Sequence, residues 1–332
     1  MTTLANKGEF GLIYQIQKQF SSLVPSGVNG MGDDCAVIPL TQKKSLLVTT
    51  DALNEETHFL RKKIAPQALG YKSLAVSLSD IAAMGGVPKY AFLSLSLPHT
   101  MSMKWINAFF KGFFALAKKH QVALLGGDTA RSQTISIDVT VLGEADPRYI
   151  KYRSSAKPGD LICVTGNLGD SGAGLQCLLR RIPQTPLVKQ LIHHHCLPRP
   201  HLTEGQWLAK HSQVHAMIDI SDGIDSDLKR ICEESYCGAE IHLDQLPISK
   251  MLYTVSQQCH WNAPEIAATG GEDYCLLITL DPDAWNKISR RFKQKFSFPL
   301  KVIGKIHPTS YDFKYFLKGK KTILTHKGYQ HF

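Results

Sequence analysis

This sequence of 332 residues lacks the marks of several common protein classes. No apolar run reaches the roughly 18 to 20 residues that a membrane-spanning helix needs, because Lys111 interrupts the most hydrophobic stretch, residues 105–117. The first residues lack the basic and apolar regions of a secretory signal, so a cytoplasmic protein is expected. The eight cysteines form no CxxC pair, which argues against a zinc site or a disulfide framework.

The usual nucleotide-binding motifs are also missing. There is no GxxxxGK(S/T) loop, no GxGxxG turn and no HRD or DFG signature of the protein kinases, which excludes the common nucleotide-binding folds. A Gly-rich segment, residues 165–174, does follow an expected strand and open an expected helix. We favour a tight strand-to-helix turn for this segment, and a phosphate site at the helix N-terminus is the alternative.

The net charge of +10 admits a nucleic-acid partner, a polyanionic small substrate, or a basic surface without such a role. Lys and Arg are spread along the chain without a basic-aromatic RNA-binding motif. We therefore favour a solvated surface and expect no nucleic-acid or membrane partner. His193, His194 and His195 invite a metal interpretation, but adjacent residues of a helix point in different directions. We expect a solvated helix end there.

Hydrophobic periodicity and turn residues predict a mixture of strands and helices. The predicted helices cover residues 6–20, 66–84, 102–119, 170–181, 223–235 and 282–295, with two more between 186 and 211. The predicted strands cover residues 45–51, 89–98, 122–128, 134–145, 161–166, 216–221, 239–244 and 273–280, and short strands close the chain. A turn-rich segment, 146–160, separates two units. We therefore predict an α/β fold with two mixed domains, residues 1–147 and 148–332.

Aspartates fall repeatedly at the ends of apolar runs, next to Gly, Ser or Thr. The positions are Asp33, Asp34, Asp51, Asp80, Asp128, Asp219 and Asp222. Each one alone suits an ordinary turn or helix cap. Together they favour a metal site, because gathered carboxylates repel one another unless a cation neutralises them, and such hard oxygen ligands suit Mg²⁺. Asp80 is the clearest case, since it lies in an otherwise apolar helical stretch.

A series of segments resembles, in order, the thiamine-monophosphate kinases. The segments are GEFGLI, GDDCAVI, TTDALNEETHF, KSLAVSLSDIAAMGG, LLGGDT, RSSAKPGD, VTGNLGDSGAGL, IDISDGIDSDL, ATGGEDY and KGYQHF, and they run from residue 8 to the C-terminus. The resemblance implies transfer of the γ-phosphoryl group of ATP to thiamine monophosphate, giving thiamine diphosphate, with several Mg²⁺ ions. It also implies a homodimer whose N-terminal sheets pair into a barrel-like sheet.

The resemblance assigns residues to these roles as well. The implied metal ligands are Asp34, Thr49, Thr50, Asp51, Asp80, Asp128, Asp219 and Asp222. The implied ATP contacts are Gly127, Asp128, Arg153 and Ser221, and the implied contacts with thiamine monophosphate are His58, Glu272 and Tyr329. No general base is expected, because the acceptor is an anionic phosphate oxygen and the transfer needs positioning and charge neutralisation.

Two alternatives stay open at this point. Another ATP-dependent enzyme of the same superfamily, such as aminoimidazole ribonucleotide synthetase, is one, although the GEFGLI and KGYQHF segments favour the thiamine enzyme. A selenophosphate synthetase is less suitable, since it would carry a cysteine or selenocysteine followed by Lys near its N-terminus, where this chain has only Lys7. A non-catalytic basic module is the second alternative, and it predicts salt-sensitive polyanion binding without ATP turnover.

Overall fold

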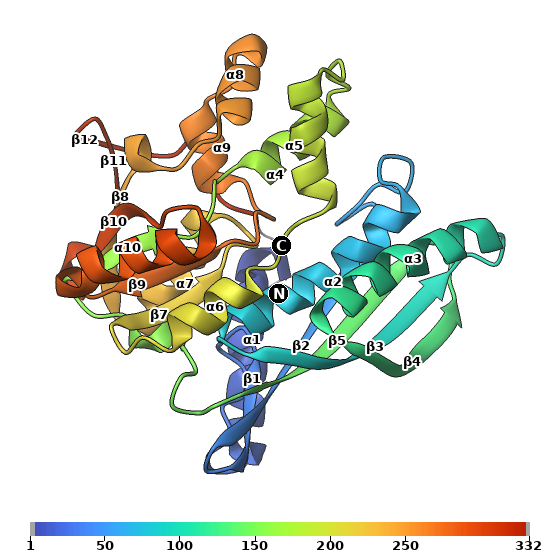
Figure 1. Cartoon of the computed structure of the whole chain (residues 1–332), viewed down its shortest axis with the longest axis horizontal. Helices are drawn as coiled ribbons and strands as arrows, with labels where there is room; N and C mark the ends of the chain where they lie inside the picture. Colours follow the sequence, from blue (N-terminus) through green and yellow to red (C-terminus); the bar gives the residue numbers. More distant parts are fainter. Residues whose placement is uncertain (1–3, 330–332) are drawn as a thin grey trace.

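A computed structural model describes residues 4–329 and shows two β-sheets with helices packed on them (Figure 1). The N-terminal sheet has five strands in the order β1-β2-β5-β3-β4. The C-terminal sheet has seven strands in the order β12-β11-β8-β10-β6-β9-β7. The mixed α/β fold predicted from the sequence is therefore confirmed. Within residues 4–329, no helix is both long enough and apolar enough to cross a bilayer.

The N-terminal sheet is covered by helices on one face. Its strands are β1 (Ala36–Thr41), β2 (Lys44–Asn54), β3 (Val87–Leu97), β4 (Ala123–Arg131) and β5 (Ser136–Ala145). β3 and β4 are parallel, and the other neighbours are antiparallel. Helices α2 (Pro66–Ala83) and α3 (Met103–His120) lie on the same face, and α1 (Leu4–Phe20) precedes the sheet (Figure 1).

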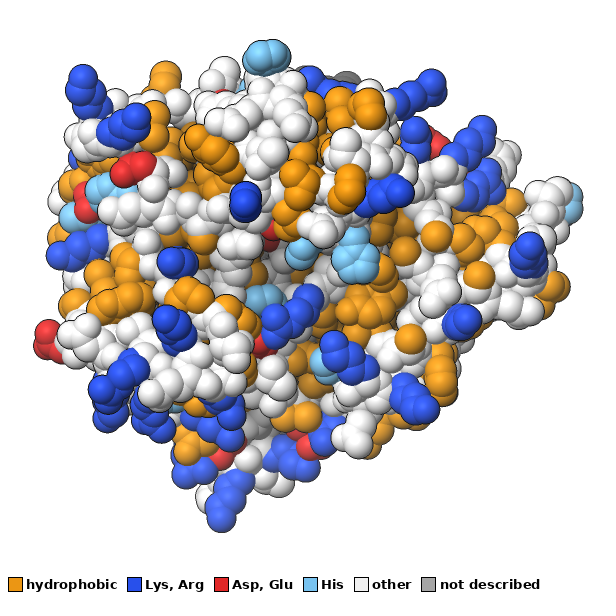
Figure 2. Space-filling view, turned by 45° about the horizontal axis from the view of Figure 1, so that its top comes forward, with side chains coloured by type: hydrophobic (Ala, Val, Ile, Leu, Met, Phe, Trp, Pro, Cys, Tyr) orange, Lys and Arg blue, Asp and Glu red, His pale blue; other side chains and the backbone are white. Residues whose placement is uncertain are grey.

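The C-terminal half contains the second sheet and the remaining helices. Its strands are β6 (Leu161–Val164), β7 (Val214–Asp219), β8 (Cys237–His242), β9 (Leu276–Leu280), β10 (Lys301–Pro308), β11 (Phe313–Leu317) and β12 (Lys320–Thr322). The helices are α4 (Asp170–Leu179), α5 (Pro186–Cys196), α6 (Leu202–Ala209), α7 (Ile224–Glu234), α8 (Lys250–Cys259), α9 (Ala263–Thr269) and α10 (Trp285–Phe296). On the face shown in Figure 2, Lys and Arg side chains are dispersed among apolar ones.

Helix α2 connects the two sheets. A proline in its first turn and Gly85, with φ of +72°, just beyond its last turn fit the rules for helix ends. The helix contacts β2 and β5 of the N-terminal sheet as well as α6 and β7. Nearly every residue from Leu69 to Ala83 is buried, because elements of both halves pack around this helix. Leu47, Leu78 and Leu208 belong to one hydrophobic core, which is therefore continuous between the two halves.

Most predicted elements are confirmed, and the differences concern short or polar segments. The sequence pattern does not predict α8, α9 or β1, a short run that contains Pro39. β2 continues to Asn54 and β4 to Arg131, beyond their predicted ends. Asp51 and Asp128 therefore lie inside strands, and the prediction that they mark strand ends is wrong. The domain boundary at residue 147 falls between the two sheets and stays a prediction.

Candidate active site

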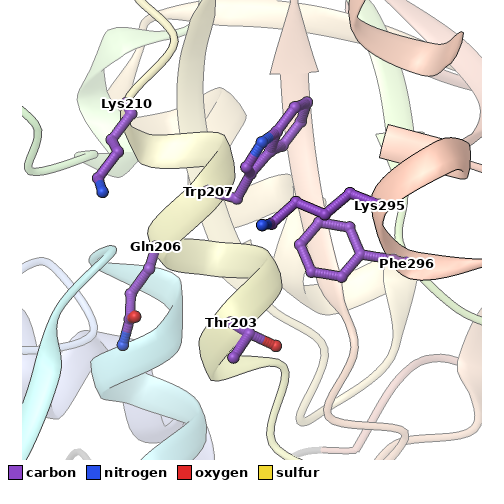
Figure 3. Close-up of a pocket in the computed structure, with 6 residues that line it drawn as sticks. All are labelled: Thr203, Gln206, Trp207, Lys210, Lys295 and Phe296. Carbon is purple, nitrogen blue, oxygen red and sulfur yellow. The ribbon is translucent and has the colours of Figure 1, made fainter. Parts of the chain in front are cut away.

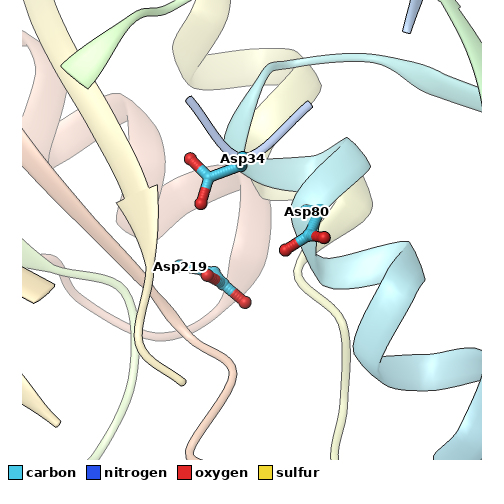
Figure 4. A group of neighbouring side chains, drawn as sticks. All are labelled: Asp34, Asp80 and Asp219. Atoms are coloured by element: carbon cyan, nitrogen blue, oxygen red, sulfur yellow. The ribbon is translucent and has the colours of Figure 1, made fainter. Parts of the chain in front are cut away.

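Carboxylates from three separate elements converge on one point (Figure 4). Asp34 lies just before β1, Asp80 lies in the last turn of α2, and Asp219 ends β7. One oxygen of each carboxylate lies within 4.8 Å of an oxygen of each of the others. Asp34 and Asp219 are buried. The group forms only when elements of both halves of the fold are in place.

Two further predicted ligands lie beside this group. Thr49 and Asp51 share the face of β2 that packs against α2, because alternate residues of a strand point to the same side. Thr49 Oγ1 donates a hydrogen bond to Asp80 Oδ2. Asp51 is close enough to Asp80 for the two carboxyl groups to share a hydrogen bond, which requires a proton on one of them.

Several of these carboxylate oxygens have no partner within the described part of the chain. The Oδ2 atoms of Asp34, Asp51 and Asp219 are each buried without a hydrogen bond. Buried polar atoms in proteins are normally paired, so a set of unpaired carboxylate oxygens needs an explanation. Hard oxygen donors of this kind are the ligands that Mg²⁺ prefers. The residues present therefore fit the metal predicted from the sequence.

The electrostatics of the group point to the same ligand class. Burial, together with the negative charge of Asp34, raises the pKa of Asp219 to about 7. Burial, followed by the charges of Asp51 and Asp219, raises the pKa of Asp80 well above its ordinary value. A cation favours the ionised form of each carboxylate and lowers these pKa values. Metal binding at this site is therefore expected to release protons.

Arg153 brings a positive charge to the same place. It begins the short 3-10 turn η2 (Arg153–Ser155), and its Nη2 lies 2.6 Å from Asp34 Oδ1. Its backbone N–H donates a hydrogen bond to Asp33 Oδ1 at 2.7 Å, and its carbonyl accepts one from Ser235 at 2.6 Å. These contacts hold Arg153 beside the carboxylates, and the family resemblance implies that it contacts ATP.

Ser221 and Asp222, also predicted site residues, lie in the loop between β7 and α7. Ser221 O accepts a hydrogen bond from the backbone N–H of Glu272 at 2.7 Å, so this loop packs against the loop before β9. Asp222 is paired with Arg230 of α7. Its backbone N–H donates to Asp227, whose carboxylate caps the helix. Asp222 is therefore a neighbour of the three-carboxylate group rather than a member of it.

The structure does not bring Thr50, Gly127 or Asp128 to the carboxylate group. Thr50 is exposed on the opposite face of β2 from Thr49, and its Oγ1 accepts a hydrogen bond from Thr140. Gly127 and Asp128 are in the exposed strand β4, which β5 and β3 separate from β2. With about 4.8 Å between neighbouring strands, the two strands lie about 14 Å apart. The roles assigned to these three residues stay predictions.

Glu272, a predicted contact of the acceptor, is held by two buried side chains. Its Oε1 lies 2.7 Å from Lys72 Nζ, and its Oε2 lies 3.1 Å from His195 Nδ1. Lys72 is 1% exposed and His195 is 5% exposed. Burial by itself would raise the pKa of Glu272, but Lys72 and the hydrogen bond from His195 outweigh it and lower the pKa to about 2. Glu272 is therefore an ionised carboxylate at neutral pH.

Lys72 and His195 are not among the site residues predicted from the sequence. His193 and His194 are exposed, but His195 is buried, so the expectation of a solvated helix end is wrong for that residue. A signal for Lys72 is present in the sequence, because it and Asp80 are the charged residues of an otherwise uncharged helix. The same reasoning that selects Asp80 applies to Lys72.

The Gly-rich segment 165–174 forms a strand-to-helix turn that begins α4. Asp273 Oδ2 accepts the backbone N–H of Gly169 at 2.6 Å, and Asp273 Oδ1 accepts that of Ser171 at 3.2 Å. A carboxylate of the protein therefore already binds the amides at this helix N-terminus. The tight-turn interpretation is confirmed, and the phosphate-site alternative is not supported.

Tyr329 reaches the loop after β7 from the far end of the chain. Its backbone N–H donates to Asp222 O at 3.1 Å, and the residue is 45% exposed. Burial raises the pKa of the Tyr329 phenol, and nearby carboxylates such as Asp222 and Glu272 raise it further. His58 lies in the turn that follows β2, where its Nδ1 accepts the backbone N–H of Asn54 at 3.0 Å. The aromatic ring and Glu272 thus lie in one region of the molecule.

A separate pocket lies between α6 and α10 (Figure 3). Its lining residues are Thr203, Gln206, Trp207, Lys210, Lys295 and Phe296. The Trp207 ring packs on Phe296, and Gln206 donates a hydrogen bond to the carbonyl of Gly86. No carboxylate lines this pocket, so it offers none of the ligands of the acidic group. We do not assign it to the active site.

Comparisons with known proteins agree with this geometry. Models of the AIR synthase related protein family match both halves of the chain, the N-terminal domain over residues 32–145 and the C-terminal domain over residues 157–313. The thiamine-monophosphate kinase of Buchnera aphidicola subsp. Acyrthosiphon pisum is 39% identical over 326 residues, 98% of each chain. That of Haemophilus influenzae is 37% identical over 329 residues, again 98% of each. The chain belongs to the thiamine-monophosphate kinase family.

Solved structures of the family extend the match to three dimensions. AaThiL complexed with AMPPCP and TMP has a TM-score of 0.87 at 34% identity and covers 100% of this chain and 99% of its own. The thiamine-monophosphate kinase of Stenotrophomonas maltophilia K279a has a TM-score of 0.77 at 34% identity, with 95% and 98% covered. The hydrogenase maturation protein HypE of E. coli, at 20% identity and a TM-score of 0.69, shares the fold. The family predicted from the sequence segments is confirmed.

Proposed function

We propose that this protein transfers the γ-phosphoryl group of ATP to the phosphate of thiamine monophosphate and releases thiamine diphosphate and ADP. One observation carries the proposal. The carboxylates of Asp34, Asp80 and Asp219 converge in a chain that matches thiamine-monophosphate kinases over 98% of its length. The similarity to AaThiL complexed with AMPPCP and TMP supports the choice of donor and acceptor.

We propose a direct in-line transfer. The new bond joins a phosphate oxygen of thiamine monophosphate to the γ-phosphorus, and the bond between that phosphorus and the β–γ bridging oxygen breaks as ADP leaves. The acceptor oxygen is already anionic, so no side chain has to remove a proton from it. The main obstacle is repulsion between two polyanions, and the protein lowers it by positioning the reactants and neutralising their charge.

The Mg²⁺ ligands that we propose are Asp34, Asp51, Asp80 and Asp219. Mg²⁺ held by these residues would supply positive charge against the phosphates of the two substrates. The buried, unpaired oxygens of this set support the assignment. Thr49 orients Asp80 through its hydrogen bond. Ligation of further ions by Thr50, Asp128 and Asp222 stays a prediction, because these side chains lie outside the converging group.

Different residues bind the two substrates in this proposal. Arg153, held against Asp34, binds phosphates of ATP through charge-assisted hydrogen bonds. Contacts of Gly127 and Ser221 with ATP stay predictions. The half-exposed ring of Tyr329 offers an aromatic face to the cationic thiazolium of the acceptor, with Glu272 nearby to add negative charge. We keep His58 as a further predicted contact of the acceptor.

We also propose a homodimer that forms through the N-terminal sheet. Large apolar side chains are exposed on its strands, among them Ile38, Tyr90, Phe92, Leu124 and Leu125. β4 at the sheet edge is exposed along its whole length. An apolar sheet surface of this kind is typical of a protein interface. Pairing of two such sheets would give the barrel-like arrangement that the sequence resemblance implies.

The proposed function is tested by measuring ADP release with different acceptors. We expect turnover with thiamine monophosphate, and none with the aminoimidazole precursor or with selenide. Asp51→Asn is expected to abolish turnover at saturating Mg²⁺ while the protein stays folded, whereas Asp283→Asn, at an exposed position, keeps it. Turnover with another acceptor alone would favour a different enzyme of the superfamily. Polyanion binding without any ADP release would favour the non-catalytic alternative.

A further inference from the structure

We propose that Lys72 and His195 are positioning residues, which hold the Glu272 carboxylate in place for the acceptor. This inference rests on the proposed function. It assigns a role to His195 and to Lys72. Lys72 begins the quoted segment KSLAVSLSDIAAMGG, but neither the resemblance nor the proposed chemistry gives it a role. The two side chains come from α2 and α5, and Glu272 comes from the loop before β9.

Lys72 is the buried cation of this set. Its side chain is 1% exposed, and its ammonium lies 2.7 Å from Glu272 Oε1. A buried ammonium group is costly unless an anion compensates it, so the pair is held together strongly. Lys72 precedes Asp80 by eight residues on α2, which corresponds to about 12 Å of helix. The same helix therefore carries both the ion-pair partner of Glu272 and one member of the carboxylate group.

His195 fixes the second oxygen of the same carboxylate. Its Nδ1 lies 3.1 Å from Glu272 Oε2 and 3.1 Å from Ser171 Oγ. Burial, together with the charge of Lys72, lowers the pKa of His195. An ionised carboxylate can only accept a hydrogen bond, so the ring nitrogen that faces Glu272 carries a proton and donates it. α5 reaches this position because residue 174 of α4 is glycine, where a Cβ would lie 2.2 Å from Leu191 O.

The backbone of Glu272 is constrained as well. Its φ is +62°, a left-handed value that is uncommon outside glycine, and its N–H is bonded to Ser221 O. Both carboxylate oxygens and the backbone are therefore fixed by separate elements. Such over-determined geometry is typical of binding residues that must present a charge in one orientation.

The test compares single and paired variants of the Lys72–Glu272 contact. Lys72→Met is expected to lower the melting temperature, because it leaves the partner charge of a buried ion pair uncompensated. It should also raise the KM for thiamine monophosphate roughly 10- to 100-fold, since Glu272 is no longer held in one orientation. The KM for ATP should change less than about twofold. The double variant Lys72→Met/Glu272→Gln removes both charges, so its melting temperature should recover while the KM for thiamine monophosphate stays raised.

His195 is tested with two replacements of different chemistry. Asn places an amide N–H near the position of Nδ1–H, so His195→Asn should keep a KM for thiamine monophosphate close to that of the wild type. His195→Leu removes the donor and should raise that KM. Lys189→Met, at an exposed lysine of the same helix, is the matched control and should behave like the wild type.

The outcomes separate this inference from the proposed function. A wild-type protein that neither binds nor phosphorylates thiamine monophosphate contradicts the proposed function itself. If the wild type is active and Lys72→Met lowers the melting temperature while its KM for thiamine monophosphate stays at the wild-type value, the ion pair is only structural and the inference is wrong. Equal KM values for His195→Asn and His195→Leu would also overturn the role of His195.

Discussion

Replacement of Asp219 by Asn tests the electrostatics of the carboxylate group in the metal-free protein. The pKa of Asp219 is about 7 in the folded protein, against 3.8 for an ordinary aspartate. Between these values the unfolded chain loses the proton and the folded chain keeps it. The contribution of Asp219 to the free energy of unfolding is therefore fully present below about pH 4 and is lost as the pH rises through about 7. The total loss is about 4 kcal/mol, because each unit of pKa difference corresponds to 1.36 kcal/mol.

Asp219→Asn removes this titration, because Asn resembles the protonated carboxyl group and stays neutral. Without metal at pH 8, the variant is expected to be more stable than the wild type by up to about 4 kcal/mol. For a chain of 332 residues, this corresponds to roughly 6 °C in melting temperature. At pH 4 the two proteins should melt at nearly the same temperature. The neighbouring Asp80 contributes in the same direction, since it loses the repulsion from Asp219.

The assay is thermal unfolding of both proteins in EDTA and in excess Mg²⁺, from pH 4 to pH 8. Mg²⁺ should raise the melting temperature of the wild type at pH 8 and have a much smaller effect on the variant. Asp283→Asn, in an exposed turn, is the control and should match the wild type in every condition. A wild-type melting temperature that is independent of pH in EDTA, with a variant less stable at pH 8, would refute this account of the site.

Three other changes test the proposed substrate and subunit contacts. Tyr329→Ala should raise the KM for thiamine monophosphate by a factor between a few and roughly thirty, because a cation–π contact contributes about 0.5–2 kcal/mol. Tyr329→Phe should keep the contact and the wild-type KM. A raised KM for ATP alone would contradict the proposed contact of Tyr329 with the acceptor. Arg153→Ala should raise the KM for ATP and change the KM for thiamine monophosphate little, as measured by steady-state kinetics with each substrate varied in turn. A raised KM for thiamine monophosphate with an unchanged KM for ATP would contradict the assignment. Phe92→Glu should place a charge in the proposed interface and give a monomer in sedimentation, whereas a wild type that is already monomeric at micromolar concentration would contradict the dimer.

Much of the fold can be predicted because local rules and tertiary packing agree along most of the chain. The Pro66 and Gly85 signals bound α2, and alternation of apolar residues predicts β3 and β5. β1 could not be predicted from its six residues, since Pro39 is unusual in a strand and is tolerated here at the sheet edge.

The candidate site is predictable only in part, because its residues are far apart in sequence. Asp34, Asp80 and Asp219 are suggested by their positions at the ends of apolar runs, next to Gly, Ser or Thr, and the structure brings them together. Strand pairing separates Asp128 from them, and no local pattern reports which strand lies next to which. The partnership of Lys72 with Glu272 spans two hundred residues, so only the folded chain reveals it.

The burial of α2 has a consequence for the order in which the active site comes into being. Its amides are protected only when the N-terminal sheet, α6 and β7 have all docked around it. Hydrogen exchange at these amides must therefore proceed through opening of the whole molecule rather than of one sheet. A nascent chain that has finished only its first 145 residues presents α2 with one side exposed, and it lacks both Asp219 and Glu272. The carboxylate group and the contact of Glu272 with Lys72 are therefore both incomplete until the C-terminal half of the chain has been added.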